Sequence, residues 1–336
     1  MSLQMKNLKV ARSSVPNVTF DNQHPSSGDT CSELMAGLGG VRKSINPKFL
    51  YDQLGSELFD QITRLPEYYP SRTETHILTR YRDEIADYCG TGCVVIEPGS
   101  GSSKKVRLLL DALAPAAYVP IDISADFLLE SSLQLGNEFP WLRIHAICAD
   151  FAHDWSLPAA LPVGKRVVFY PGSTIGNMEP AAAQSFLLRL RQWIGSQQGG
   201  VLLGVDLQKS VGRLEAAYDD AAGVTARFNL NLLCHINAAL NADFDPGSFD
   251  HHAFYNTEHH RIEMHLVSKQ AQSVRCNGAT IQFAEGESIH TENSYKYTLQ
   301  GFEALAAKAG FRLCRGWLDD EALFSVLYLE PVGGGG

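Results

Sequence analysis

The chain has 336 residues, of which 45% are hydrophobic and 19% are charged, so it can bury one large core or two smaller ones. Its formal net charge of −9 argues against a broad phosphate-binding face, and we expect no nucleic-acid partner. No apolar run reaches the roughly 18 to 20 residues of a membrane helix, and the N-terminal region lacks the pattern of a secretory signal. We expect a cytoplasmic monomer without membrane contact.

Two sequence features bear on metal binding. The seven cysteines are scattered and none are spaced as Cys-x-x-Cys, so we expect reduced thiols rather than a disulfide framework or a zinc ribbon. The run from 250 to 266 holds five histidines. Neighbouring residues on a strand point to opposite faces, and the run contains no His-Glu-x-x-His helix pattern, so we expect no bound metal.

The N-terminal third begins with residues 1–35, which are rich in serine, proline, asparagine and aspartate and show little periodicity. This composition predicts a flexible N-terminal arm. From there to about residue 90 apolar residues recur at helical spacing, for example at Ile77, Tyr81 and Ile85. The folded part of the chain is therefore predicted to begin with helices.

Between residues 93 and 208, short runs rich in β-forming residues alternate with helical stretches. CVVIEPG is followed by KKVRLLLDAL, and AYVPIDIS is followed by ADFLLESSLQL. Such alternation predicts an α/β fold in which crossover helices cover a doubly wound, Rossmann-like parallel sheet.

The pattern changes after residue 208. We expect a helix from Phe228 to Leu240, β-rich segments up to about residue 297, a further helix, and a last strand pair that ends in FSVLYLE and returns to the main sheet. The predicted organisation is a sheet domain of residues 72–208 plus 295–332, and a second α+β lobe of residues 36–71 plus 209–294 that binds the substrate.

A glycine loop marks the candidate ligand site. The segment VVIEPGSGSSKKVRLLL places Gly99 and Gly101 directly after a buried strand and before a helix, where doubly wound folds bind nucleotide-like ligands. The third glycine of the dinucleotide pattern is absent, which favours a ligand without a phosphate bridge, such as S-adenosylmethionine (SAM). By themselves, the two glycines fit a tight strand-to-helix turn equally well.

Acidic residues at the next two strand ends favour the SAM interpretation. Asp122 can accept hydrogen bonds from both ribose hydroxyls, and Asp150 can accept one from the adenine amino group. Either acid alone also suits a turn or a helix cap. Phe151 offers an apolar face to the adenine ring. Lys105 either meets the methionine carboxylate or is a solvated lysine of the first helical turn.

Long segments of the chain resemble a known family. They include LYDQLGSELFDQITRLPEYYPSRTETHIL, EPGSGSSKKVRLLLDAL, YPGSTIGNMEP, AAYDDAAGVTARFNLNLL, RIEMHL and TENSYKY, and the resemblance extends over nearly everything from about residue 40 onward. The sequence resembles the histidine-specific N-α-methyltransferase family, which makes histidine betaine (hercynine) on the way to ergothioneine. The resemblance implies a class I methyltransferase sheet and SAM as cofactor. One departure is Pro98, where the family has leucine or another apolar residue.

The resemblance also implies site residues. On the substrate side Tyr51 and Tyr68 would line the pocket, with Tyr51 close to the α-amine; Asn177 and Tyr218 would hold the carboxylate; Glu292 and Ser294 would bind the imidazole, and Met264 would pack beside it. On the cofactor side the matching positions are Gly99, Gly101, Lys105, Asp122, Asp150 and Phe151.

The chemistry of methyl transfer is compatible with these residue types. Displacement at a sulfonium needs alignment and a neutral amine rather than a covalent nucleophile, and we expect Tyr51 to relay the amine proton through water. Asparagine and tyrosine suit a carboxylate because both donate hydrogen bonds without neutralising it. Glu292 and Ser294 are two residues apart on a predicted strand, so they share one face. Without the resemblance, a solvent-facing strand pair would explain that spacing as well.

Two alternatives stay open. One is methylation of another amino acid, above all tryptophan, because relatives of the family use indoles. Loss of the acid in the TENS segment would favour an indole, and this chain keeps Glu292. The other is a protein of the same fold that binds an amino acid and SAM without catalysis. The presence of both cofactor and substrate positions argues against it.

Overall fold

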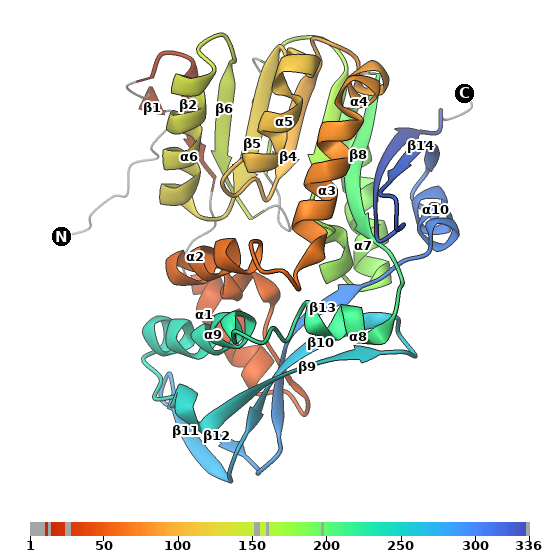
Figure 1. Ribbon diagram of the computed structural model, residues 1–336. Helices are drawn as coiled ribbons and strands as arrows, with labels where there is room; N and C mark the ends of the chain where they lie inside the picture. Colours follow the sequence, from red (N-terminus) through yellow and green to blue (C-terminus); the bar gives the residue numbers. More distant parts are fainter. Residues whose placement is uncertain are drawn as a thin grey trace, which may run out of the picture.

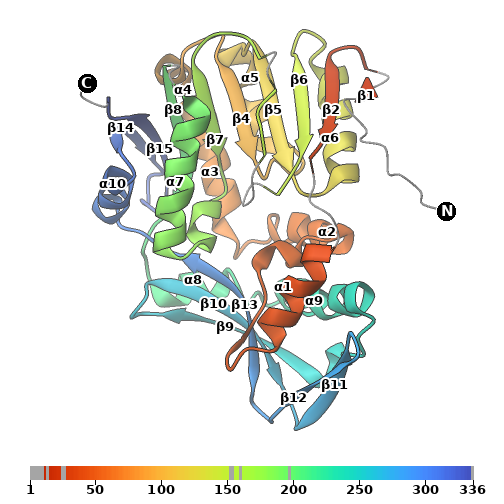
Figure 2. The ribbon, with the colours of Figure 1, turned by 180° about the vertical axis from the view of Figure 1, so that it is seen from behind.

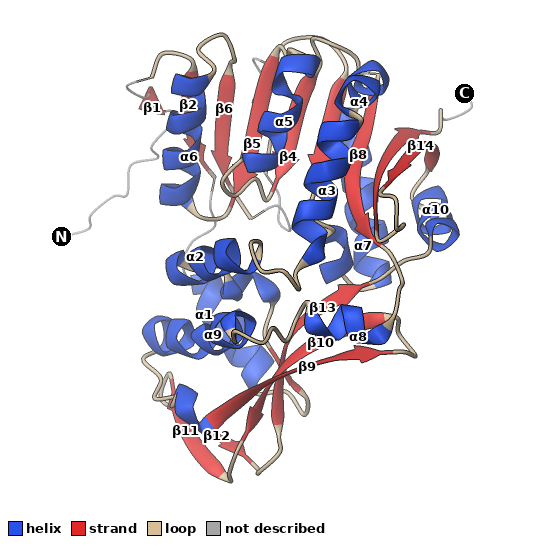
Figure 3. Cartoon of the chain, in the orientation of Figure 1, coloured by secondary structure: helices blue, strands red, loops and turns tan. Residues whose placement is uncertain are grey.

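The computed structural model describes residues 11–12, 15–23, 28–150, 155–158, 161–195 and 198–333. The chain forms two lobes (Figure 1). One lobe is built on a large sheet with helices on both faces, and the other combines helices with a smaller sheet (Figure 3).

The large sheet has nine strands in the order β1-β2-β6-β5-β4-β7-β8-β15-β14. The neighbouring pairs from β2 to β8 are parallel, and β15 and β14 extend the edge beside β8 as antiparallel strands. This topology confirms the predicted α/β fold and the return of the last strand pair. The strands are β1 Ala11–Arg12, β2 Val18–Asn22, β4 Val94–Pro98, β5 Ala117–Asp122, β6 Ile144–Cys148, β7 Arg166–Tyr170, β8 Gly199–Asp206, β14 Phe311–Leu318 and β15 Phe324–Pro331.

Helices cover both faces of this sheet. One face carries α3 Tyr69–Arg80, α4 Arg82–Cys89, α5 Lys104–Leu113 and α6 Ala125–Glu138 (Figure 1). The other face carries α7 Pro180–Ile194 and α10 Leu299–Lys308 (Figure 2). In α5 the buried residues Val106, Leu109, Leu110 and Leu113 recur every three or four positions, so one apolar stripe faces the sheet. Among the described residues, no helix combines the length and the apolar character that a membrane crossing demands.

The second lobe has its own hydrophobic core, which draws on residues 34–69 and 214–289 with Leu323. We propose that the predicted substrate lobe, 36–71 plus 209–294, is one domain on this basis. Its sheet has the order β3-β13-β10-β9, beside a separate β11-β12 hairpin. Its elements are α1 Gly28–Leu38, β3 Lys43–Ser44, η1 Pro47–Leu50, α2 Gln53–Ile62, α8 Val211–Ala216, α9 Val224–Leu240, η3 Pro246–Ser248, β9 Phe249–Asn256, β10 Arg261–Ser268, β11 Gln272–Cys276, β12 Ala279–Phe283 and β13 Ser288–Tyr295.

The structure differs from the predicted flexible arm over two segments of residues 1–35. Val18–Asn22 pairs in parallel with β6 and extends the large sheet, and α1 begins at Gly28. The physical reason is burial: Val18 packs into the sheet lobe and Leu34 into the second lobe, so each segment gains an apolar contact that its polar composition conceals.

Candidate active site

The two lobes meet at the carboxyl ends of the parallel strands. Asp150 follows β6, and its Oδ2 atom lies 3.0 Å from the Nζ atom of Lys48 in η1 of the second lobe. Lys48 also pairs with Glu33 at 2.7 Å. This ion pair therefore ties a strand end that carries a predicted cofactor residue to the second lobe.

The predicted cofactor loop is held by the neighbouring strand. Gly99 and Gly101 have φ values of 68° and 50°, which favour glycine. The Gly101 amide donates a hydrogen bond of 2.9 Å to Oδ2 of Asp122, and burial raises the pKa of Asp122. The buried hydroxyl of Ser100 has no hydrogen-bond partner among the described residues. An unpaired polar atom and a carboxylate beside a glycine turn fit a polar ligand such as SAM.

The other cofactor positions have partners in the protein. Lys105 forms an ion pair with the buried carboxylate of Glu74, so it is neither a solvated lysine nor a free cation. The single N–H of Gly172 also donates to Glu74 and is shared between the two carboxylate oxygens, each 2.9 Å from the amide nitrogen. Asp150 is engaged by Lys48. Phe151 lies outside the described residues. The cofactor roles of these positions stay predictions.

Replacing Asp122 by alanine is expected to weaken SAM binding by roughly 1.5 to 3 kcal/mol, because the ribose hydroxyls lose a charged acceptor. Calorimetric titration measures this change. Asp126→Ala, which removes an exposed acid from the first turn of α6, is the matched control and should keep the wild-type affinity. Unchanged SAM affinity in folded Asp122→Ala protein would show that this strand end does not hold the ribose.

The predicted imidazole-binding residues lie on β13 and β10. Met264 and Glu292 are paired directly across these antiparallel strands, and Ser294 is opposite Ile262. All three predicted residues are buried. The Oε2 atom of Glu292 has no hydrogen-bond partner among the described residues. Burial raises the pKa of Glu292 to about 7, although Lys296 opposes this rise. A buried, unpaired carboxyl group is costly in an empty protein and is ready to receive a polar ligand.

Three tyrosines surround Glu292. The Tyr68 and Tyr218 rings meet edge to face with centroids 6.1 Å apart. The Tyr51 ring packs against Phe59 and Phe228 at 5.5 Å each. Burial raises the pKa of Tyr51 well above its usual value, and the negative charge of Glu292 adds to this rise. Burial also raises the pKa values of Tyr68 and Tyr218 well above their usual value. The three hydroxyls are therefore protonated near neutral pH.

Asn177 reaches the same region from the sheet lobe. It is the last residue of the short helix η2 Thr174–Asn177, which follows β7. This helix packs closely on β13: a Cβ atom at Gly176 would lie only 2.8 Å from the Tyr295 carbonyl oxygen. Glycine is therefore required beside Asn177, and the close approach places Asn177 near the strand that carries Glu292 and Ser294.

A buried charged cluster behind these residues was missed by the sequence predictions. Asp206, at the end of β8, pairs with Lys209 at 2.6 Å and with Lys296 at 2.8 Å, and Tyr69 donates to it at 2.7 Å. Lys296 also donates to the hydroxyls of Tyr218 and Ser294. The acid at a strand end was the available signal for Asp206, and the TENSYKY segment contains Lys296, whereas Lys209 lies in none of the segments that carry the resemblance.

The raised pKa of Glu292 makes a prediction about stability. The folded protein holds this proton up to about pH 7, whereas an ordinary glutamate, as in the unfolded chain, loses it near 4.5. The protonated group therefore contributes to the free energy of unfolding at low pH, and this contribution is lost as the pH rises through 7. Glu292→Gln stays neutral throughout. Without ligands, its stability advantage over wild type should grow by about 2 kcal/mol between pH 5 and pH 8.

Thermal or urea unfolding at the two pH values measures this advantage. Glu285→Gln, at an exposed position between β12 and β13, is the control and should show no such change. If the advantage of Glu292→Gln were the same at pH 5 and pH 8, Glu292 would not be a buried acid of raised pKa.

A histidine cluster lies on the other face of the small sheet. Glu263, His265 and His290 bring possible metal-ligand atoms within 4.8 Å of one another, and no other such group occurs in the described ranges. Glu263 already accepts hydrogen bonds from Arg261 at 2.8 Å and Asn256 at 2.9 Å. The two imidazole rings stack nearly in parallel, with centroids 4.6 Å apart, and their nitrogens have partners in the protein: Nε2 of His265 lies 3.1 Å from Oε2 of Glu263, and Nε2 of His290 lies 3.1 Å from the Glu292 carbonyl oxygen. The absence of a metal stays a prediction.

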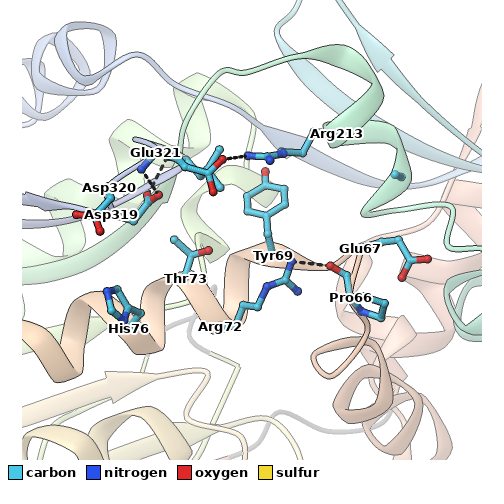
Figure 4. A pocket seen from close by; sticks show the side chains of 12 residues that line it. Pro66, Glu67, Tyr69, Arg72, Thr73, His76, Arg213, Asp319, Asp320 and Glu321 are labelled. Atoms are coloured by element: carbon cyan, nitrogen blue, oxygen red, sulfur yellow. Dashed lines mark hydrogen bonds and ion pairs between the residues drawn. The ribbon is translucent and has the colours of Figure 1, made fainter.

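An open pocket of about 510 Å³ lies outside the predicted site (Figure 4). Its walls come from α3, α8 and the turn between β14 and β15, and include Arg72, Arg213 and Glu321. Tyr69 is the link to the site, because its hydroxyl binds Asp206. None of the predicted substrate or cofactor residues lines this pocket.

Comparison with known proteins gives consistent matches. The sequence model of a family described as "Histidine-specific methyltransferase, SAM-dependent" matches residues 30–331. The chain is 44% identical over 302 residues to histidine N-alpha-methyltransferase of Mycolicibacterium smegmatis and 42% identical over 303 residues to that of Mycobacterium tuberculosis. Each match covers 88% of this chain and 92% of the relative.

A more distant relative is a longer protein. The chain is 30% identical over 289 residues to "Ergothioneine biosynthesis protein 1" of Neurospora crassa, a match that covers 80% of this chain and 31% of that protein. These matches confirm the predicted resemblance: the chain belongs to the family of histidine-specific, SAM-dependent methyltransferases.

Proposed function

We propose that this protein transfers three methyl groups from SAM to the α-amino nitrogen of L-histidine and so forms histidine betaine (hercynine) for ergothioneine biosynthesis. The observation that carries the proposal is the buried carboxyl group of Glu292, whose Oε2 atom has no partner in the described structure. It lies two residues from Ser294 and opposite Met264. The names of the relatives and the family description support the same substrate.

The side chains around Glu292 match the parts of histidine. Glu292 accepts a hydrogen bond from one imidazole nitrogen, and Ser294 donates one to the other, which selects a single tautomer of the ring. Met264 provides an apolar surface for the ring. Tyr218 and Asn177 donate to the α-carboxylate. With both ends held, the amine points toward the junction with the cofactor loop.

The amine must lose one proton before each of the three transfers, because only a neutral nitrogen has a free electron pair. The raised pKa of Tyr51 means that its hydroxyl does not act as a strong anionic base at neutral pH. Tyr51 instead accepts a hydrogen bond from the amine and passes the proton to water, as a relay. Tyr68 closes the same side of the pocket.

The loop glycines, the Ser100 hydroxyl, Asp122 and Asp150 are the groups that would hold SAM. When bound, SAM supplies a methyl group that bonds to the amine nitrogen, while the electron pair of the broken carbon–sulfur bond stays on sulfur. The protein contributes alignment and the exclusion of water from this junction.

Incubation of the protein with SAM and each of the twenty amino acids, followed by tandem mass spectrometry, tests the proposal. We expect histidine to gain three methyl groups on the α-nitrogen and none on the ring. Ring-methylated histidine would overturn the orientation, and methylated tryptophan would support the indole alternative. Calorimetry with S-adenosylhomocysteine (SAH) and histidine tests the alternative of a binding protein without catalysis. Such a protein would bind both ligands and yet form no methylated product. A cytoplasmic location and a monomeric state stay predictions of the sequence.

A further inference from the structure

Lys296 stands where the chain passes from the small sheet to the large one. It follows β13, and its amide donates to the His260 carbonyl at 2.8 Å. The next residue, Tyr297, pairs with the segment after β8. The Lys296 side chain is completely buried, and it has a fixed position because both lobes contribute to its surroundings.

The ammonium group of Lys296 has three donors, and the structure provides three acceptors. They are Oη of Tyr218 at 2.9 Å, Oγ of Ser294 at 2.8 Å and Oδ2 of Asp206 at 2.8 Å. Every donor is therefore used within the protein. In the proposed function the hydroxyls of Tyr218 and Ser294 bind the substrate. Lys296 can influence both hydroxyls without touching the substrate itself.

Counting the hydroxyl protons exposes a conflict. The oxygens of Tyr218 and Ser294 are 2.7 Å apart, so one of the two hydroxyls donates to the other. Only one hydroxyl proton then remains for a ligand. The proposed binding of histidine needs two, since Tyr218 donates to the carboxylate and Ser294 to the imidazole. The hydrogen bond between Tyr218 and Ser294 must therefore open when histidine binds.

We propose that Lys296 is the positioning residue that permits this exchange. This inference rests on the proposed function. Lys296 donates to both oxygens at once, so each keeps a cationic hydrogen-bond donor after the Tyr218–Ser294 bond opens. Both protons then turn toward histidine, while the oxygens stay in place. Without Lys296, the hydroxyl that accepts the Tyr218–Ser294 hydrogen bond would lose its donor when that bond opens, so histidine would have to displace the bond with nothing to replace it.

The first test compares Lys296→Met with Lys209→Met. Methionine keeps an unbranched apolar stem, and Lys209 is the matched control because it also binds Asp206 at 2.6 Å but donates to neither hydroxyl. Calorimetry on the SAH complexes should show histidine affinity about 10- to 100-fold lower in Lys296→Met. Lys209→Met should stay within about threefold of wild type. SAH affinity should be unchanged in both.

The second test asks whether Lys296 acts through the hydroxyls. In a Tyr218→Phe/Ser294→Ala background, Lys296→Met should cost histidine affinity less than about threefold further, because there are no hydroxyl oxygens left to hold. A loss as large as in the wild-type background would overturn the proposal in favour of a general charge effect. Equal losses in Lys296→Met and Lys209→Met would overturn it as well.

Folding and function have separate readouts. If Lys296→Met fails to bind SAH, Lys296→Gln replaces it in the same comparisons, because its amide keeps two N–H donors; the expected loss is then smaller but still disappears in the background without hydroxyls. If wild-type protein with SAH binds no histidine, the proposed function fails. If wild-type protein binds histidine and the Lys296 variant binds it with the same affinity, only the inference about Lys296 is contradicted.

Discussion

Glu292→Ala is expected to lower kcat/KM for histidine by roughly one and a half to three decades. This corresponds to a loss of about 2 to 4 kcal/mol of transition-state stabilisation. An imidazole N–H in this buried site loses its acceptor when the carboxyl group is removed, and leaving a buried donor unpaired is costly. SAM affinity should change little. Glu285→Ala, at an exposed position between β12 and β13, should retain wild-type kinetics.

The same variant tests selectivity. A double variant, Glu292→Ala with Met264→Val, makes the pocket larger and less polar still. Methylation of an indole substrate should therefore increase relative to methylation of an imidazole substrate. Competition assays with equal concentrations of histidine and tryptophan measure the ratio of products. Wild-type selectivity in Glu292→Ala would mean that this carboxyl group does not recognise the side chain, and the assignment of histidine would lose its main physical support.

Asp206→Asn is expected to lower the free energy of unfolding by about 3 to 5 kcal/mol, because it leaves two buried lysines without their shared carboxylate. Burial alone raises the pKa of Asp206, but Lys296 and Lys209 outweigh it and hold the pKa below its usual value. The carboxylate is therefore charged at neutral pH. Asparagine keeps the shape and removes the charge, so the loss reports electrostatics rather than packing.

Urea unfolding at pH 7 measures this effect. Asp320→Asn is the matched control, since Asp320 also pairs with a cation, Arg80 at 2.7 Å, but its side chain is 81% exposed. That variant should stay within roughly 0.5 kcal/mol of wild type because water screens surface ion pairs. A loss below about 1 kcal/mol in Asp206→Asn would show that the two lysines do not depend on this carboxylate.

The family and the main fold could be read from the sequence because their signals are local. Alternation of strand and helix patterns between residues 93 and 208 predicted the sheet that the structure contains. The glycine turn with Asp122 and Asp150 at successive strand ends is the local pattern behind the predicted ligand site, which stays a prediction. Long matching segments predicted the family, which the comparisons confirm. Each signal depends on neighbours within about 30 residues, where propensity and periodicity are informative.

Partnerships across the lobes were decided by the tertiary structure. Asp206 and Lys296 are 90 positions apart, yet they form one buried ion pair, and Lys48 meets Asp150 across the junction. Val18–Asn22 joined the sheet although its composition suggested an arm. Periodicity describes which face of an element is apolar, but it carries no information about which distant polar group lies opposite. That choice is made when the two cores close and every buried charge must find a partner.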